Sequence, residues 1–179
     1  PAASRRGTST PWAEESVGMS RFLPPRLLGE GDDLSAFECG EPVVDTWVRR
    51  RALRSVRAGT ASVHVVTTEA GIIAGLYSLS AHSVLRADVQ GGWLRRNLPE
   101  QIPAVLLGML GVDRRFQGFG LGGSLLADAI ERALVVSRQV GARAVLVDPA
   151  SEKAGMFYKR YGFKVVPGTG WMYLPLGRG

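Results

Sequence analysis

A glycine-rich turn flanked by arginines lies between residues 113 and 123. Its residues fit the spacing R/Q-x-x-G-x-G/A, and two further glycines follow at once. The matching residues are Arg115, Gln117, Gly118, Gly120, Gly122 and Gly123. A turn without β-carbons lets backbone N–H groups at the start of a helix point at an anion, and the helix dipole favours the negative charge. Arg114 and Arg115 stand where they can add charge-assisted contacts. The turn therefore predicts a binding site for a pyrophosphate group.

The elements on either side of this turn have the order strand, turn, helix. Residues 104–112 form a nearly continuous apolar run, which is typical of a central strand covered on both faces. Residues 120–140 place apolar side chains on one helical stripe, and Gly141 follows the end. No Lys-Ser/Thr follows the glycines and no βαβ unit opens the chain. The pattern therefore argues against a nucleotide-hydrolysing loop and a dinucleotide-binding fold.

The rest of the chain predicts an α/β domain of the α+β type. Hydrophobic periodicity indicates a helix at 41–58 and a helix of about ten residues after Ser151, a good N-cap. Strands are expected at 61–68, 72–82, 144–147, 164–167 and 171–176, with 83–90 as a candidate for one more. Residues 1–19 lack any period and are interpreted as a disordered extension or a leftover from cloning. Residues 20–179 are expected to form a single domain.

Basic residues outnumber acidic ones, with 22 Lys and Arg against 16 Asp and Glu and a formal charge of +6. This balance favours an anionic ligand or partner. One face of the helix at 41–58 is rich in arginine and is either a phosphate-tracking stripe or a solvated surface. Its arginines are Arg49, Arg50, Arg51, Arg54 and Arg57. Arg95 and Arg96, beside Trp93, form a second basic spot in what is either a plain surface loop or a holder for an anionic substrate.

The single cysteine, Cys39, cannot form an internal disulfide, and with only His64 and His82 it supplies no set of metal ligands. We therefore expect no metal site and a reducing cytoplasmic location. Cys39 resembles a buried small apolar residue, and both histidines are interpreted as satisfied strand residues. No apolar run reaches the roughly 18 residues of a membrane-spanning helix, so a soluble, non-exported protein is predicted.

A second motif follows the glycine turn at a distance, where Phe157-Tyr158 precedes Tyr161-Gly162-Phe163. With both motifs in this order, the sequence resembles the GCN5-related N-acetyltransferase (GNAT) superfamily. The resemblance implies the GNAT fold, a central, mostly antiparallel mixed sheet flanked by helices, with a V-shaped split between its two central strands. It also implies acetyl-CoA as the cofactor.

The closer resemblance is to the acetyltransferase toxins of bacterial type II toxin–antitoxin pairs, which modify the amino group of aminoacyl-tRNA. It is carried by residues 44–52, 95–99, 102–103, 112–118, 157–158 and 161–163. This branch commonly reads L-G-R-L-A-V before the turn, whereas this chain has Met109 and Gly111 at the two differing positions. Further implied properties are a homodimer and a ribbon-helix-helix antitoxin as partner.

The resemblance assigns roles to individual residues. Backbone groups of Leu110 and Val112 would grip the pantetheine arm. The pyrophosphate would be bound by the turn and the helix start, with Arg114, Arg115, Gln117, Gly118, Gly120, Leu121, Gly122 and Gly123 as the cofactor-binding set. The transfer RNA would be bound by Arg49, Arg50, Arg54, Arg57, Arg95 and Arg96.

Tyr158 is the predicted acid for the departing thiolate, because a phenol with a pKa of about 10 is well matched to that task. Packing under the last helix, like Phe157, is the alternative. No base is evident: Asp113 and Asp148 either hold a water molecule or are structural caps. Acetylation of a small amine or protein, and a non-enzymatic acetyl-CoA-binding role, are alternative functions.

Overall fold

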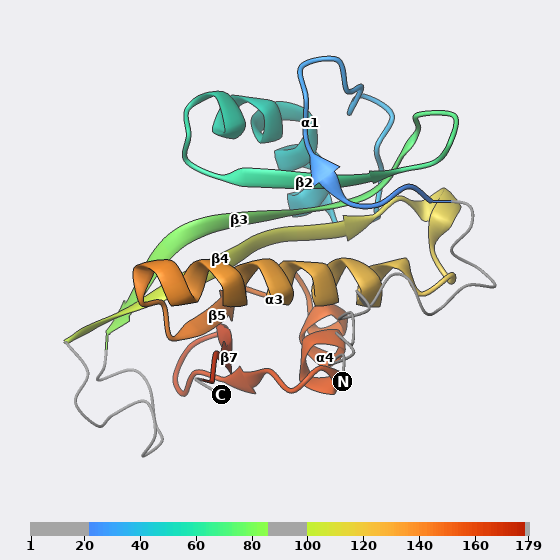
Figure 1. Cartoon of the computed structure of the whole chain (residues 1–179). Helices are drawn as coiled ribbons and strands as arrows, with labels where there is room; N and C mark the ends of the chain where they lie inside the picture. Colours follow the sequence, from blue (N-terminus) through green and yellow to red (C-terminus); the bar gives the residue numbers. More distant parts are fainter. Residues whose placement is uncertain (1–21, 86–99, 178–179) are drawn as a thin grey trace, which may run out of the picture.

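A seven-stranded mixed sheet with helices on both faces forms the molecule (Figure 1). The structure is a computed structural model and describes residues 22–85 and 100–177. The strands are β1 Arg26–Leu27, β2 Ser62–Thr67, β3 Ile73–Leu85, β4 Gln101–Val112, β5 Ala144–Val147, β6 Lys164–Val165 and β7 Met172–Pro175. The helices are α1 Pro42–Arg57, α3 Leu121–Val140 and α4 Glu152–Arg160, with a 3-10 turn, η4, at Arg114–Phe116. The strand order across the sheet is β1-β2-β3-β4-β5-β7-β6.

The two central strands, β4 and β5, separate part-way along their length. They are the one parallel pair among the described strands, and their register runs from Ala104 opposite Ala144 to Leu107 opposite Val147. Residues 109–112 of β4 continue beyond this point and pair only with β3. The sheet therefore opens into a V at the end of β4 that leads into the glycine turn. This observation confirms the predicted split.

Helices cover the two faces of the sheet separately, as Figure 1 shows. Side chains alternate between the faces along each strand, so Tyr77 packs on one side and Leu76 on the other. The Tyr77 face is covered by α3, which contributes Leu121, Leu125 and Leu126 to the larger hydrophobic cluster. The Leu76 face is covered by α1. The arginine-rich helix and the helix that follows the glycine turn therefore lie on opposite sides of the sheet.

Local signals explain where the helices begin and end. Pro42 opens α1, where its missing N–H costs nothing. Gly120 and Gly141 flank α3 with φ values of 79° and 77°, a conformation that favours glycine. The hydroxyl of Ser151 accepts a hydrogen bond of 3.2 Å from the N–H of Ala154 at the start of α4. The predicted N-cap is therefore confirmed.

Several strand predictions differ from the structure in their bounds; β4, for example, begins at Gln101, three residues earlier than expected. Residues 83–85 continue β3 without a break and pair with residues 101–103 of β4, so the first part of 83–90 is not a separate strand. Residues 86–90 lie outside the described residues. At the other edge, β6 ends at Val165, because the chain turns after Val166, whose carbonyl accepts the Thr169 N–H at 3.2 Å. β7 runs from Met172 to Pro175, one residue shorter at each end than expected.

None of the helices in the described ranges combines the length and the apolar character needed to cross a lipid bilayer.

Candidate active site

A cleft of about 600 Å³ lies where β4, the glycine turn and α4 meet. Such a volume is typical of a small-molecule site. Three distant parts of the chain line it: residues 39–41, many residues between 110 and 123, and α4 with the residue that follows it. The cleft opens at the end of the V between β4 and β5, since Leu110 and Val112 belong to the part of β4 that has left β5.

The glycine turn is held in an open form by its own backbone. Gly118 and Gly120 have φ values of 84° and 79°, which side chains with a β-carbon rarely adopt. No atom lies within 4 Å of the β-carbon position of either residue, so both face open space. The first turn of α3 follows directly, and its N–H groups have no partner within the helix. This arrangement gives the cleft a floor of backbone donors suited to an anion.

Asp113 fixes the start of the turn. Its buried carboxylate accepts hydrogen bonds from the Arg115 N–H at 3.0 Å and from the Glu38 N–H at 3.2 Å. The Arg115 guanidinium adds two contacts to the same carboxylate, at 2.8 and 2.9 Å. Burial raises the pKa of Asp113, but the contacts with Arg115 and Glu38 outweigh it, so the pKa lies below its ordinary value. Asp113 is therefore a structural cap and does not line the cleft.

Residues 38–41, here called the wall segment, are tied to the turn by backbone and side-chain hydrogen bonds. The N–H of Arg114 donates to the Glu38 carbonyl at 2.8 Å, and their side chains form an ion pair at 2.8 Å. The side-chain amide of Gln117 donates to the carbonyls of Cys39 and Val112, at 2.8 and 2.9 Å. Gln117 therefore joins the wall segment to the end of β4.

Close packing places the wall segment against β4. A β-carbon on Gly111 would lie 3.1 Å from Val44 and 3.3 Å from the Cys39 sulfur, tighter than ordinary van der Waals contact. The carboxylate of Asp45 accepts the N–H groups of Cys39 and Gly40, at 2.7 and 3.1 Å, which fixes the segment to α1. Glycine at position 111, one of the two departures from the toxin pattern, therefore has a packing reason.

A single hydrogen bond connects the wall segment with α4. The Ser151 hydroxyl donates to the Glu41 carboxylate at 2.8 Å. Glu41 is the N-cap residue of α1 and Ser151 that of α4. Because α1 packs against β2 and β4 while α4 follows β5, this hydrogen bond spans the mouth of the V.

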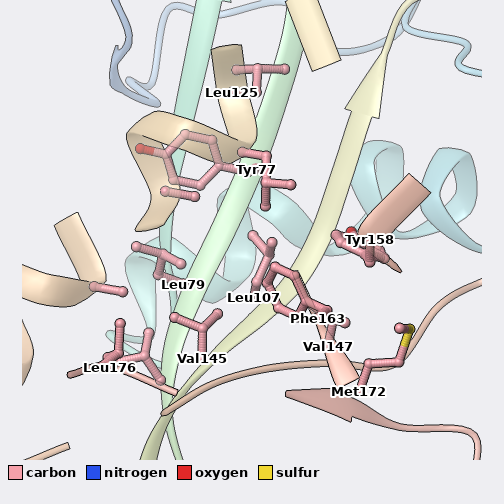
Figure 2. Packing of buried hydrophobic residues seen from close by; sticks show 14 of the residues in the cluster. Tyr77, Leu79, Leu107, Leu125, Val145, Val147, Tyr158, Phe163, Met172 and Leu176 are labelled. Carbon is pink, nitrogen blue, oxygen red and sulfur yellow. The ribbon is translucent and has the colours of Figure 1, made fainter. Parts of the chain in front are cut away.

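Tyr158 is mostly buried, with 7% of its surface exposed, and it still lines the cleft. Its ring packs on Phe163 at 5.3 Å and on Phe157 at 5.3 Å. Figure 2 shows it at the edge of the hydrophobic cluster, beside Phe163. Burial raises the pKa of the phenol, so the hydroxyl stays protonated at neutral pH. The core-packing role and a place in the cleft coexist at this residue.

The predicted cofactor-binding residues gather in one place, with a single exception. Those that line the cleft are Leu110, Val112, Arg114, Gln117, Gly118, Gly120, Leu121, Gly122 and Gly123. Arg115 does not line it, because its guanidinium is engaged by Asp113 and lies over the Phe116 ring at 5.5 Å. Its role in the structure is to hold the turn.

The predicted RNA-binding arginines differ from one another in their surroundings. Arg49 donates to the Phe37 carbonyl at 2.9 Å, and Arg57 pairs with Glu30. Arg50 and Arg54 are exposed and form no ion pair within residues 22–85 and 100–177. Arg95 and Arg96 lie outside the described residues.

The remaining candidates for acid–base chemistry lie away from the cleft or are unreactive. Asp148 is exposed at the end of β5. His64 is buried, and its Nδ1 has no hydrogen-bond partner within the described residues. The prediction that its hydrogen-bonding groups are satisfied is therefore wrong. It stacks on Tyr77 at 5.0 Å, and burial lowers its pKa to about 4. His82 stacks on Trp171 at 5.3 Å. Cys39 lines the cleft, but burial raises its pKa to about 12.

Sequence reasoning missed several lining residues on and after α4. Lys153, Phe157 and Arg160 lie at spacings of four and three, which places them on one helical face. Arg160 lies over the Phe157 ring at 6.0 Å, and the Phe157 ring contacts Tyr161 at 5.0 Å. This spacing was visible in the sequence. The wall segment carried no such local signal.

Comparison with known proteins identifies the family. Residues 59–165 match the sequence profile described as "Acetyltransferase (GNAT) domain", which spans more than half of the chain. The chain belongs to the GNAT acetyltransferase family. The split sheet and the glycine turn at its mouth are therefore those of a GNAT protein, although α1 and the wall segment lie outside the matched range.

Relatives within this GNAT family share most of the chain. The "tRNA-acetylating toxin" of Mycobacterium tuberculosis (strain ATCC 25618 / H37Rv) is 40% identical over 150 residues, which is 83% of this chain and 89% of that protein. A solved structure of AtaT complexed with acetyl-methionyl-tRNAfMet has a TM-score of 0.77 and 28% identity, covering 85% of this chain and 94% of that chain.

A second solved structure also bears on the cleft. A tyrosine-to-phenylalanine mutant of the toxin AtaT, bound to the C-terminus of the antitoxin AtaR and to acetyl-CoA, has a TM-score of 0.72 and 27% identity. It covers 86% of this chain and 92% of that chain.

Proposed function

We propose that this protein is an acetyl-CoA-dependent toxin that acetylates the α-amino group of aminoacyl-tRNA and so blocks translation. One observation carries the proposal: the split sheet, the open glycine turn and Tyr158 meet in one cleft. The 40% identity to a tRNA-acetylating toxin supports the choice of acceptor.

The lining of the cleft fits acetyl-CoA. Gly118 and Gly120 leave open space over the backbone donors at the start of α3, as a pyrophosphate requires. Arg114, Lys153 and Arg160 add positive charge, which suits a ligand carrying several phosphates. The pantetheine arm would lie along Leu110 and Val112, in the part of β4 that does not pair with β5. When bound, acetyl-CoA supplies the acetyl group as a thioester.

Tyr158 has the properties of a proton donor to a leaving thiolate. Burial raises the pKa of its phenol above the ordinary value, which is already well above neutral pH, so Tyr158 carries a proton to give, and the residue lines the cleft. General acids of this kind contribute about 10²- to 10⁴-fold to the rate. Arg115 is left out of the cofactor set in this proposal, since Asp113 engages it.

The acceptor RNA would approach the outer face of α1. Arg50 and Arg54 are exposed one helical turn apart, which suits phosphate contacts. Arg95 and Arg96 remain candidates from the sequence. We further propose that residues 20–179 form one acetyltransferase domain, that the protein is a cytoplasmic homodimer, and that a ribbon-helix-helix antitoxin neutralises it. The solved structure of AtaT bound to the C-terminus of the antitoxin AtaR supports an antitoxin as the partner.

The decisive experiment supplies acetyl-CoA labelled in the acetyl group together with aminoacyl-tRNA. Label is expected on the RNA and should disappear when the aminoacyl ester is hydrolysed, and uncharged tRNA should stay unlabelled. Tyr158→Phe keeps the ring packing and should lower kcat by at least about 100-fold while acetyl-CoA binding persists. Label on a protein or small amine alone would indicate an ordinary acetyltransferase, and binding without transfer to any acceptor would indicate a non-enzymatic protein.

A further inference from the structure

The acceptor of an acetyltransferase must lose a proton before it attacks, and the cleft holds one group suited to take it. An α-amino group has a pKa of about 7.7 to 8.0, so part of it is protonated at neutral pH. Among the described residues that line the cleft, Glu41 is the only one with a carboxylate, and no histidine lines it. The two aspartates considered from the sequence do not fit the role of base. Asp113 forms an ion pair with Arg115, and neither Asp113 nor Asp148 lines the cleft.

The position of Glu41 is fixed from three sides. It is the N-cap residue of α1, so its backbone is set by the start of that helix. Its carbonyl lies against the Cys39 thiol, and the wall segment is anchored to Asp45 and Gln117. The Ser151 hydroxyl donates to one carboxylate oxygen, Oε1, at 2.8 Å. A carboxylate held by one hydrogen bond keeps capacity to accept another from an ammonium group.

Charged and titratable side chains line the same cleft as Glu41. The positive lining residues are Arg114 beside the turn and Lys153 and Arg160 on α4, which suit the phosphates. Glu41 bridges the V where β4 and β5 separate, and Tyr158 lines the same cleft from α4. The other titratable groups that line this cleft are Cys39, Tyr158 and Tyr161, and its other charged residues are Arg114, Lys153 and Arg160.

We propose that the Glu41 carboxylate binds the protonated amine of the acceptor and accepts one proton from it. This inference rests on the proposed acetyl transfer to an amine. The neutral nitrogen forms its bond to the carbonyl carbon of the acetyl thioester, and the carbon–sulfur bond breaks. Tyr158 gives its proton to the sulfur and recovers one from the new amide nitrogen. Glu41 releases its proton to water, so each turnover converts an ammonium and a thioester into an amide, a thiol and one proton.

The test compares Glu41→Gln with wild type across pH. Glutamine retains an oxygen that can accept the Ser151 hydrogen bond, but it cannot take a proton. Glu152→Gln is the matched control, because Glu152 is an exposed acid on α4 that does not line the cleft. Single-turnover acetylation of aminoacyl-tRNA is measured with saturating labelled acetyl-CoA between pH 5.5 and 8.5, and acetyl-CoA binding is measured by calorimetry.

Below the pKa of the acceptor amine, the variant depends on the small neutral fraction of the amine. The rate ratio of wild type to Glu41→Gln should therefore grow about tenfold for each unit of falling pH. It should come within a few-fold of one above the amine pKa, while Glu152→Gln behaves as wild type and acetyl-CoA affinity is unchanged. A ratio that is constant across pH, or equal to one throughout, would overturn the role of Glu41 alone. Absence of any acetylation by the wild type would overturn the proposed function and this inference together.

Discussion

The hydroxyl of Tyr161 occupies the space that a β-carbon on Gly123 would fill. Gly123 lies in the first turn of α3, and Tyr161 follows α4, so this contact brings the two helices together beside the cleft. Both residues line the cleft. Glycine at position 123 therefore leaves room for the Tyr161 hydroxyl, in addition to exposing backbone donors at the start of α3.

Gly123→Ala should weaken acetyl-CoA binding by displacing Tyr161. The ring is 44% exposed and can swing away, so the free energy of unfolding should change by less than about 1 kcal/mol. The displaced ring would then move relative to the phosphate end of the cleft, and KM for acetyl-CoA should rise. The double variant with Tyr161→Phe removes the clashing oxygen and should recover most of the loss. No recovery in titration calorimetry would contradict this account.

Arg160→Ala and Lys153→Ala should each raise KM for acetyl-CoA by about three- to tenfold, because each removes a positive charge from the lining. The effect should shrink as salt concentration rises. Lys159→Ala provides the control, since Lys159 is exposed on the same helix but does not line the cleft. Equal effects for all three variants would point to a general charge effect.

Replacing Arg50 and Arg54 with alanine should raise KM for aminoacyl-tRNA and leave KM for acetyl-CoA unchanged. Each phosphate contact that is lost should lower the slope of log affinity against log salt by about one. Arg57 is exposed too but pairs with Glu30, so Arg57→Ala should have the smaller effect on RNA affinity. Filter binding at several salt concentrations measures the slopes. Unchanged slopes would place the RNA elsewhere on the protein.

Acid should destabilise the protein partly through His64. Burial and the positive charge of Arg132 lower the pKa of His64 to about 4, so the folded state excludes a proton that the unfolded chain binds near pH 6.5. This contribution is present in full above pH 6.5 and is lost as the pH falls towards 4, at a cost of about 3 kcal/mol.

His64→Phe keeps an aromatic ring beside Tyr77 and carries no titratable group. Its free energy of unfolding should therefore fall less steeply than that of wild type between pH 6.5 and 4. Urea denaturation at each pH gives the comparison. Parallel curves for the two proteins would show that His64 does not exclude the proton.

Local signals were sufficient to predict the elements around the glycine turn. The apolar run of β4, the glycines at positive φ and the stripe of α3 all lie within forty consecutive residues, from Gln101 to Val140. Tyr158 was found through its motif, and the structure adds that it is buried. The family resemblance, confirmed by the sequence profile, supplied the split between β4 and β5, which no local pattern encodes.

The rest of the cleft depends on contacts between distant residues. Glu38 meets Asp113 at a separation of 75 residues, and Glu41 meets Ser151 at a separation of 110. Neither contact leaves a periodicity in the sequence, so the wall segment was not predicted. The motif predicts that Arg115 binds the cofactor. In the structure its guanidinium instead donates hydrogen bonds to the buried carboxylate of Asp113, two residues earlier.

The wall segment lies early in the chain, far in sequence from the residues that it contacts. The ribosome synthesises residues 38–41 early, whereas their hydrogen-bond partners at 113–117 and Ser151 are synthesised much later. Helix α4, which forms one side of the cleft, comes later still. A nascent chain that lacks α4 also lacks Tyr158 and one side of the Glu41 bridge. Contacts of such long range form late in folding. A ribosome can therefore translate most of this message before its product is able to act on aminoacyl-tRNA, the acceptor proposed above, which the same ribosome consumes.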